Sequence, residues 1–126
     1  VPCVYDGMEL NGPDLLDGPV RTRVGASCSD AQLTDGYLLD YLAKGFAVLS
    51  IGTDAPDIHE IDGVPLYHVA LTQADDPHGM LRDRYLGPAA HAIYLIRPDQ
   101  HVVARWSSAT VDDIGAAMRT ALGKGV

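Results

Sequence analysis

The sequence predicts an α/β fold in which helices cover one mixed β-sheet. Two observations lead to this class. Apolar runs with the length of buried strands alternate with segments in which apolar residues recur at helical spacing. The end of the chain is then typical of two strands joined by a tight turn and followed by one amphipathic helix.

Length, composition and charge limit the classes of protein and partner. The 126 residues suffice for one domain with its own core, and 47% apolar with 21% charged residues is typical of a globular chain. A net charge of −8 makes nucleic acid and anionic membranes poor partners. No apolar run reaches the roughly 20 residues of a membrane span and no signal peptide is present, so we expect a cytoplasmic protein. Because the first residue is Val1, we expect a fragment or a processed chain.

Residues 1–30 are predicted to form an irregular arm or linker, and residues 31–126 the folded domain. Glycine and proline recur in the first segment too often for a long helix or strand. It also contains Cys3 and Cys28, the only cysteines of the sequence. Two distant cysteines in a chain of this length are typical of free thiols in a reducing compartment.

The domain begins with a short candidate strand at residues 31–33 and a helix over residues 34–45. Leu38 and Leu42 belong to an apolar stripe with helical spacing. Gly45 suits the left-handed residue that ends a helix.

Two further runs predict strands of a sheet covered on both faces. Residues 46–51 are almost continuously apolar, and residues 66–71 are mainly apolar. The segment between them is acidic and rich in turn formers, so the helix expected in this crossover is weakly encoded. After the second run, Asp76 and Pro77 are typical of the start of a short helix.

The remaining residues predict a β-hairpin and a closing helix. Residues 92–96 and 101–106 are the strands, and Pro98 favours a turn between them. Thr110 and Asp113 have the spacing of a capping box ahead of an apolar stripe. This order of elements predicts a thioredoxin-like sandwich with a central mixed sheet, a βαβ unit followed by a β-hairpin and a C-terminal helix.

The sequence lacks the Cys-x-x-Cys motif of a working thioredoxin. That motif needs a helix N-terminus, where the dipole and the second thiol lower the first pKa. We expect this position at residues 33–38, which contain no cysteine. Thioredoxins also carry a proline before the strand that faces the dithiol, and His91 takes that place here.

Residues 92–106, Ala-Ile-Tyr-Leu-Ile-Arg-Pro-Asp-Gln-His-Val-Val-Ala-Arg-Trp, resemble a known motif. It is the Arg-Pro-Asp hairpin near the C-terminus of FAD-dependent aromatic-ring hydroxylases, the phenol hydroxylase-like flavoprotein monooxygenases. Residues 31–36 and 39–49 resemble the Leu-x-Asp-Gly, Leu-x-Asp and Gly-x-Phe-x-Leu-Leu pattern that opens the same domain. The resemblance covers residues 23–122.

Two positions depart from the family pattern. The family often has Pro-Gly-x-Arg-x-Pro before the first strand, where this chain has Val-Gly-Ala-Ser-Cys at residues 24–28. The hairpin turn carries Gln100 where glycine is common. Neither substitution is expected to change the fold.

The resemblance implies a C-terminal accessory or dimerisation domain without catalytic, cofactor-binding or metal-binding residues of its own. The parent enzyme would use FAD, NAD(P)H and O₂ to hydroxylate an aromatic ring. Its partners would be the N-terminal FAD domain of the same polypeptide and a second copy in a homodimer. The family's flavin motifs have no counterpart in this sequence, which contains no Gly-x-Gly-x-x-Gly.

The hairpin residues Arg97, Pro98, Asp99, Arg105 and Trp106 have two interpretations. Arginine and tryptophan are frequent anchors of protein interfaces, so the hairpin is a candidate docking surface. Alternatively, Pro98 and Asp99 shape the turn, and Trp106 packs on the last helix. The structural interpretation is the more common one for such residues.

Two other functions stay open at this stage. The chain is alternatively a stand-alone thiol peroxidase with Cys28 as the nucleophile, which would need a nearby arginine such as Arg21 or Arg23 to lower the thiol pKa. It is alternatively a thioredoxin-fold module that binds other proteins. Its five histidines lack the short fixed spacing of zinc ligands, and residues 54–62 lack the ligand pattern of a calcium loop.

Overall fold

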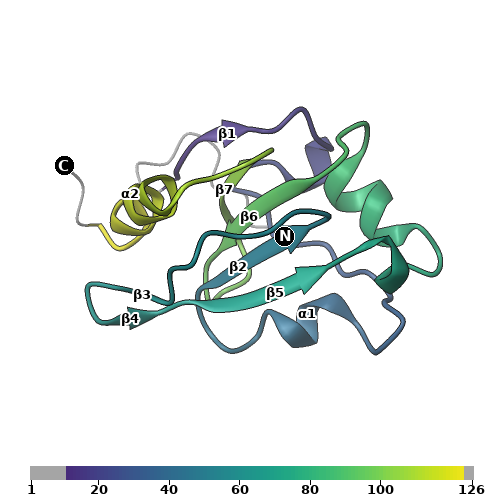
Figure 1. The fold of residues 1–126 in the computed structure, drawn as a ribbon, viewed down its shortest axis with the longest axis horizontal. Coiled ribbons are helices and arrows are strands. Elements are labelled where there is room, and N and C mark those ends of the chain that lie inside the picture. The colour runs from purple at the N-terminus through teal and green to yellow at the C-terminus, as the bar shows by residue number, and fades with distance from the viewer. Residues whose placement is uncertain (1–10, 124–126) are drawn as a thin grey trace.

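The computed structural model describes residues 11–123, which form a five-stranded mixed sheet with helices on both faces (Figure 1). The strand order is β1-β7-β6-β2-β5, and β2 runs parallel to β5 and antiparallel to β6. This is the predicted mixed α/β architecture of thioredoxin-like type. The strands are β1 (Asp14–Leu15), β2 (Ala47–Ile51), β5 (Tyr67–Leu71), β6 (Ala92–Ile96) and β7 (Val102–Trp106).

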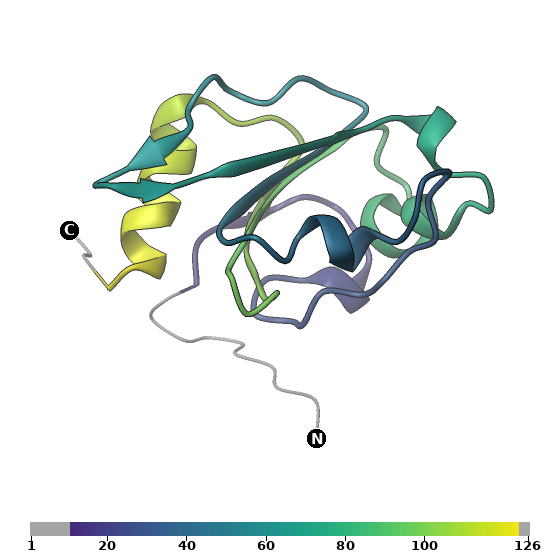
Figure 2. The same cartoon turned by 90° about the horizontal axis from the view of Figure 1, so that it is seen from below.

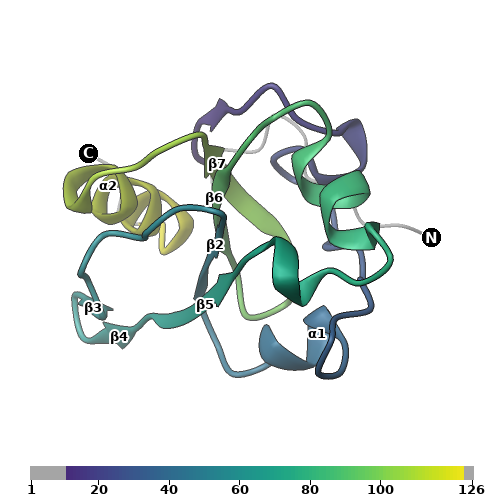
Figure 3. The same cartoon turned by 45° about the vertical axis from the view of Figure 1, so that its right-hand side comes forward.

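The sheet separates two hydrophobic clusters. Figure 3 shows α2 on one side of the sheet and α1 on the other. One face is covered by α1 (Leu38–Tyr41) and by the helical segment that ends in the π-helical turn η3 (Arg82–Leu86). The other is covered by α2 (Val111–Ala121). Every residue of β2, β6 and β7 is buried, because these three strands have neighbours on both sides and helices above and below.

The crossover between β2 and β5 contains a hairpin where a helix was weakly expected. Its strands are β3 (Glu60–Ile61) and β4 (Val64–Pro65). Asp62 and Gly63 join them with φ angles of 50° and 83°, so both central residues are left-handed, as in a type I′ turn. The hairpin lies beside α2, and Ile61 is buried in the same cluster (Figure 2).

The first predicted elements of the domain differ from the observed ones. The strand predicted at residues 31–33 was wrong, since only an isolated bridge between Gln32 and Tyr37 forms there. Gly36, with φ of 85°, turns the chain, and Tyr37 is extended, so the helix starts at Leu38 and not at residue 34. The apolar stripe was nevertheless correct, because Leu38 and Leu42 are fully buried.

Residues 11–30 lie against the sheet, and the division at residue 31 stays a prediction. β1 pairs in parallel with β7, and the short 3₁₀ helix η1 (Val20–Thr22) packs against η3. Residues 1–10, and with them Cys3, lie outside the described residues.

A partly buried ion pair joins β1 to β7. The guanidinium of Arg105 donates to the carboxylate of Asp14 at 2.6 Å and to the carbonyl of Pro19 at 2.8 Å. Arg105 is only 4% exposed. Burial alone would lower the pKa of Arg105, but its hydrogen bonds to Asp14 and Tyr94 raise it above the ordinary value, so the group stays charged.

Buried hydroxyls extend these contacts to η1 and η3. Thr22 is fully buried and donates to the carbonyl of Arg84 at 2.6 Å. Tyr94 donates to the carbonyl of Tyr85 at 2.5 Å, and Tyr85 donates to the carbonyl of Ser29 at 2.5 Å. Two of these carbonyls lie in the last residues of η3, where a helix leaves its carbonyls without intrahelical partners, and the third lies in the irregular segment before α1.

Two other predicted local signals are confirmed, whereas Gly45 does not end the first helix, because α1 stops at Tyr41. The side chains and backbones of Thr110 and Asp113 form a capping box at the start of α2. The turn between β6 and β7 closes with a hydrogen bond from the Gln100 amide to the Arg97 carbonyl. Gln100 has a φ of 63°, which accounts for the preference for glycine at such a position.

We expect Asp14→Ala to lower the free energy of unfolding by about 2–4 kcal/mol, because Arg105 would stay buried without its counter-ion. Urea denaturation measures the change. Asp17→Ala is the matched control, since Asp17 is exposed and its loss should change stability by no more than about 0.5 kcal/mol. Equal effects of the two substitutions would contradict a structural role of the ion pair.

Gln100→Ala should destabilise the protein by about 1 kcal/mol. The variant keeps the left-handed backbone but loses the hydrogen bond from the side-chain amide of Gln100 to the Leu39 carbonyl. Gln100→Gly loses the same hydrogen bond but relieves the backbone cost, so its stability should stay about 1 kcal/mol above that of the alanine variant. Thermal unfolding of both variants tests this order. A glycine variant no more stable than the alanine variant would refute it.

Candidate functional site

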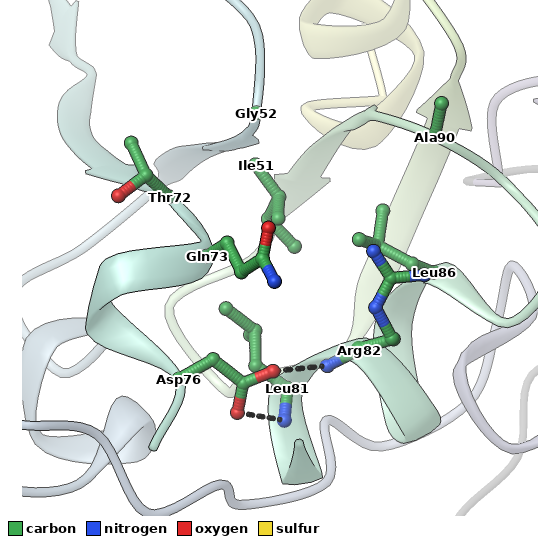
Figure 4. A pocket seen from close by; sticks show the side chains of 9 residues that line it. All are labelled: Ile51, Gly52, Thr72, Gln73, Asp76, Leu81, Arg82, Leu86 and Ala90. Atoms are coloured by element: carbon green, nitrogen blue, oxygen red, sulfur yellow. Dashed lines mark hydrogen bonds between the residues drawn. The ribbon is translucent and has the colours of Figure 1, made fainter. Parts of the chain in front are cut away.

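The carboxyl ends of the parallel strands β2 and β5 border a pocket of about 160 Å³ (Figure 4). Ligands of α/β proteins commonly bind at this end of parallel strands, where loops leave the sheet. The buried side chains of Ile51, Leu81 and Leu86 contribute apolar surface to the lining. Gln73 and Arg82 add polar groups from two other segments of the chain.

Asp76 orders the wall of this pocket. Its carboxylate accepts hydrogen bonds from the backbone amides of Leu81 and Arg82, both at 3.0 Å (Figure 4). The predicted capping role of Asp76 is therefore confirmed, although the helical turns begin at residue 80 and Pro77 lies in the preceding turn. Both carboxylate oxygens are engaged by amides at the positive end of these helical turns.

The position equivalent to a thioredoxin dithiol lies beside this pocket. In a βαβ unit the motif follows the first of the two parallel strands, which is β2 here. The prediction that placed it at residues 33–38 was wrong, because those residues precede β2. The segment that follows β2, residues 52–56, reads Gly-Thr-Asp-Ala-Pro and also contains no cysteine.

Cys28, the nucleophile of the alternative peroxidase hypothesis, lies at the edge of the core under the β6–β7 turn. Its backbone amide donates to the carbonyl of Gln100 at 2.7 Å, and its side chain is a free thiol packed against the first hydrophobic cluster. Burial raises its pKa to about 12, opposed by a hydrogen bond with Tyr85 and reinforced by the charge of Asp99. A thiol with this pKa is a poor nucleophile at neutral pH.

The hairpin residues singled out by the sequence divide into an exposed tip and a buried end. Arg97 and Asp99 form an ion pair at 2.6 Å, and Pro98 is exposed between them. Arg105 and Trp106 are 4% and 3% exposed. Trp106 belongs to the cluster under α2, so only the tip of the hairpin is available to a partner.

The polar residues of the buried network were not identified from the sequence. Tyr94 lies inside an apolar strand, which signals a buried hydroxyl that needs a hydrogen-bond partner. The partner is not readable from the pattern, because Thr22 is 72 positions away and Asp14 is 91 positions from Arg105.

The histidines are spread over the fold, and His59, His68, His91 and His101 make contacts within the chain. His68 and His91 are hydrogen-bonded to the carbonyls of Ile58 and Ser107, and the rings of His59 and His68 lie 4.8 Å apart. In the part of the chain that the structure describes, no group of three or more His, Cys, Asp or Glu side chains is placed to hold a metal ion.

We expect the Cys28 thiol to react with Ellman's reagent far more slowly than a free thiol at pH 7.5, since its thiolate fraction is about 1,000-fold smaller. Urea-unfolded protein, in which the thiol is exposed, is the control and should react at the ordinary rate. A native rate equal to the unfolded rate would contradict the burial of this thiol.

The same raised pKa values predict a pH dependence of stability. The unfolded chain loses the Cys28 proton near pH 9 and the Tyr85 proton near pH 10, whereas the folded protein keeps both. Their contribution to stability is therefore complete below pH 9 and falls as the pH rises beyond it. Thermal unfolding between pH 7 and 11 measures the decline, and Cys28→Ala should make it shallower.

Comparison with solved structures relates the chain to flavin enzymes. The substrate-free rebeccamycin biosynthetic enzyme RebC matches with a TM-score of 0.61 and 26% identity, over 97% of this chain and 22% of RebC. RebC with reduced flavin matches with a TM-score of 0.63 and 23% identity, over 97% of this chain and 23% of that one. The flavin-dependent monooxygenase PieE, in complex with FAD and substrate, matches with a TM-score of 0.51 and 21% identity, over 82% of this chain and 19% of PieE.

Other comparisons add no relative. No protein-family profile matches the sequence, and no curated protein matches it. Among the described residues, no helix combines the length and apolar character required to cross a bilayer. The chain thus spans about a fifth of the length of the flavin enzymes that share its fold.

Proposed function

We propose that this chain is the C-terminal accessory domain of an FAD-dependent aromatic-ring hydroxylase and carries no catalytic machinery of its own. One observation carries the proposal: the match with RebC covers 97% of this chain but only 22% of the RebC chain. A match that covers almost all of one protein and a small part of a larger one is typical of a domain shared between them. In the parent enzyme, FAD and NAD(P)H would serve ring hydroxylation outside these residues.

The chemistry of the chain supports an accessory role. The sequence contains no glycine-rich dinucleotide motif. The pocket at the ends of β2 and β5 holds about 160 Å³, too little for a dinucleotide cofactor. Cys28, the only described cysteine, has a strongly raised pKa.

The exposed apolar side chains supply a surface for the proposed partners, the FAD domain of the same polypeptide and a second copy. Leu15 and Val20 are 66% and 73% exposed, on neighbouring parts of the N-terminal segment. Large exposed apolar side chains on this segment are candidate contacts with another protein surface. Leu15 and Val20 are thus candidate contacts in addition to the tip of the β6–β7 hairpin.

The gene gives the first test of the proposal. We expect the open reading frame to extend for several hundred codons upstream of Val1 and to encode a Gly-x-Gly-x-x-Gly motif between a strand and a helix. A start codon directly before Val1 that follows an in-frame stop codon would overturn it.

Flavin binding gives the second test. Titration of FAD with the purified 126-residue chain should leave the flavin fluorescence unchanged, whereas the full-length enzyme should hold one FAD per polypeptide. Deletion of this domain from the full-length enzyme should preserve the flavin and lower the thermal stability or the oligomeric state. Stoichiometric flavin on the isolated chain, or a deletion without effect on stability and assembly, would contradict the proposal.

A further inference from the structure

We propose that the pocket at the carboxyl ends of β2 and β5 binds a small carboxylate whose hydrocarbon body is about the size of one six-membered ring. The proposal goes beyond the accessory role and does not depend on it. It rests on three properties of the pocket: its volume, the apolar side chains in its lining, and one guanidinium that has no partner among residues 11–123.

The volume limits the ligand to a single ring. A cavity of about 150 Å³ lined by aliphatic and aromatic side chains is large enough for benzene. The pocket here has about 160 Å³ and is partly open to solvent. A ring therefore fits inside while a polar substituent reaches the opening.

The lining favours a hydrocarbon body over a purely polar ligand. Ile51, Leu81 and Leu86 are 3%, 1% and 5% exposed, and each contributes to the wall. They belong to the main hydrophobic cluster, so the inner part of the pocket is continuous with the core. Water at such a surface has few hydrogen-bond partners, and an apolar group displaces it favourably.

The rim favours an anionic substituent. The Arg82 guanidinium makes no hydrogen bond or ion pair with any residue between 11 and 123, whereas Asp76 is engaged by two backbone amides. Arg82 and Gln73 are both exposed, and their side chains line the pocket (Figure 4). A guanidinium matches the two oxygens of a carboxylate with parallel hydrogen bonds, and the Gln73 amide supplies a further donor.

The overall charge limits the affinity. The chain carries a net charge of −8, so an anion is repelled by the rest of the surface and retained only near Arg82. Arg82 is itself exposed, which weakens its attraction through the solvent. For a ligand of this size we expect a Kd on the order of 1 mM.

Titration with sodium benzoate, followed by two-dimensional ¹⁵N–¹H NMR, tests the proposal. We expect saturable shifts of the backbone amides of Gly52, Gln73, Arg82 and Ala90. Acetate carries the charge without the ring, and benzyl alcohol the ring without the charge. Each should bind at least about 5-fold more weakly than benzoate. Absence of saturable benzoate shifts at these amides, or equal affinity for acetate, would overturn the proposal.

Three variants separate the contributions of charge and cavity. Arg82→Gln should weaken benzoate about 5-fold and leave benzyl alcohol unchanged. Arg21→Gln, an exposed arginine on η1, is the matched control and should bind benzoate like the wild type. Ala90→Leu, which fills the pocket, should abolish both interactions. If Arg82→Gln and Arg21→Gln weaken benzoate equally, the anion senses only the general charge of the protein and the assigned site is wrong.

Discussion

The ion pair between Arg105 and Asp14 is the constraint on which the rest of this fold depends. A guanidinium inside an apolar sheet needs a counter-charge, because an unpaired buried charge costs several kcal/mol. Asp14 supplies it from the opposite end of the sequence, and this pairing brings the irregular residues 11–30 onto the edge of the sheet. Once there, Thr22 and the carbonyl of Ser29 meet the hydroxyls of the buried tyrosines, so one charge organises a whole polar layer.

The parts of the fold that could be predicted from sequence are those encoded by neighbouring residues. Strands β2, β6 and β7, the capping box at Thr110 and the turn at Pro98 all follow from periodicity or turn chemistry within a few positions. β1 could not be predicted, since it has two residues and exists only through its pairing with β7. The β3–β4 hairpin was readable from Asp62-Gly63, but the expectation of a crossover helix took precedence over that turn signal.

The candidate site divides in the same way. The absence of a Cys-x-x-Cys motif can be seen directly in the sequence. The raised pKa of Cys28 is consistent with an inert thiol. Whether the hairpin residues lie on the surface could not be predicted, because a sequence does not show which side chains are buried. In the structure, Arg105 and Trp106 are buried. The pocket could not be predicted from the sequence, because its lining residues, Gln73 and Arg82 among them, come together only in the folded chain.

The parallel pairing of β1 with β7 also has a consequence for the order of folding during synthesis. These strands are separated by about 90 residues, so the edge of the sheet cannot be completed until the last strand has left the ribosome. Until then, residues 11–30 have no strand edge to pair with, and the carboxylate of Asp14 lacks its partner Arg105. The central β2–β5 and β2–β6 pairs form from shorter loops and precede this step. Residues 11–30 are therefore the last part of the described chain to become ordered, after the core around β2, β5 and β6 has assembled.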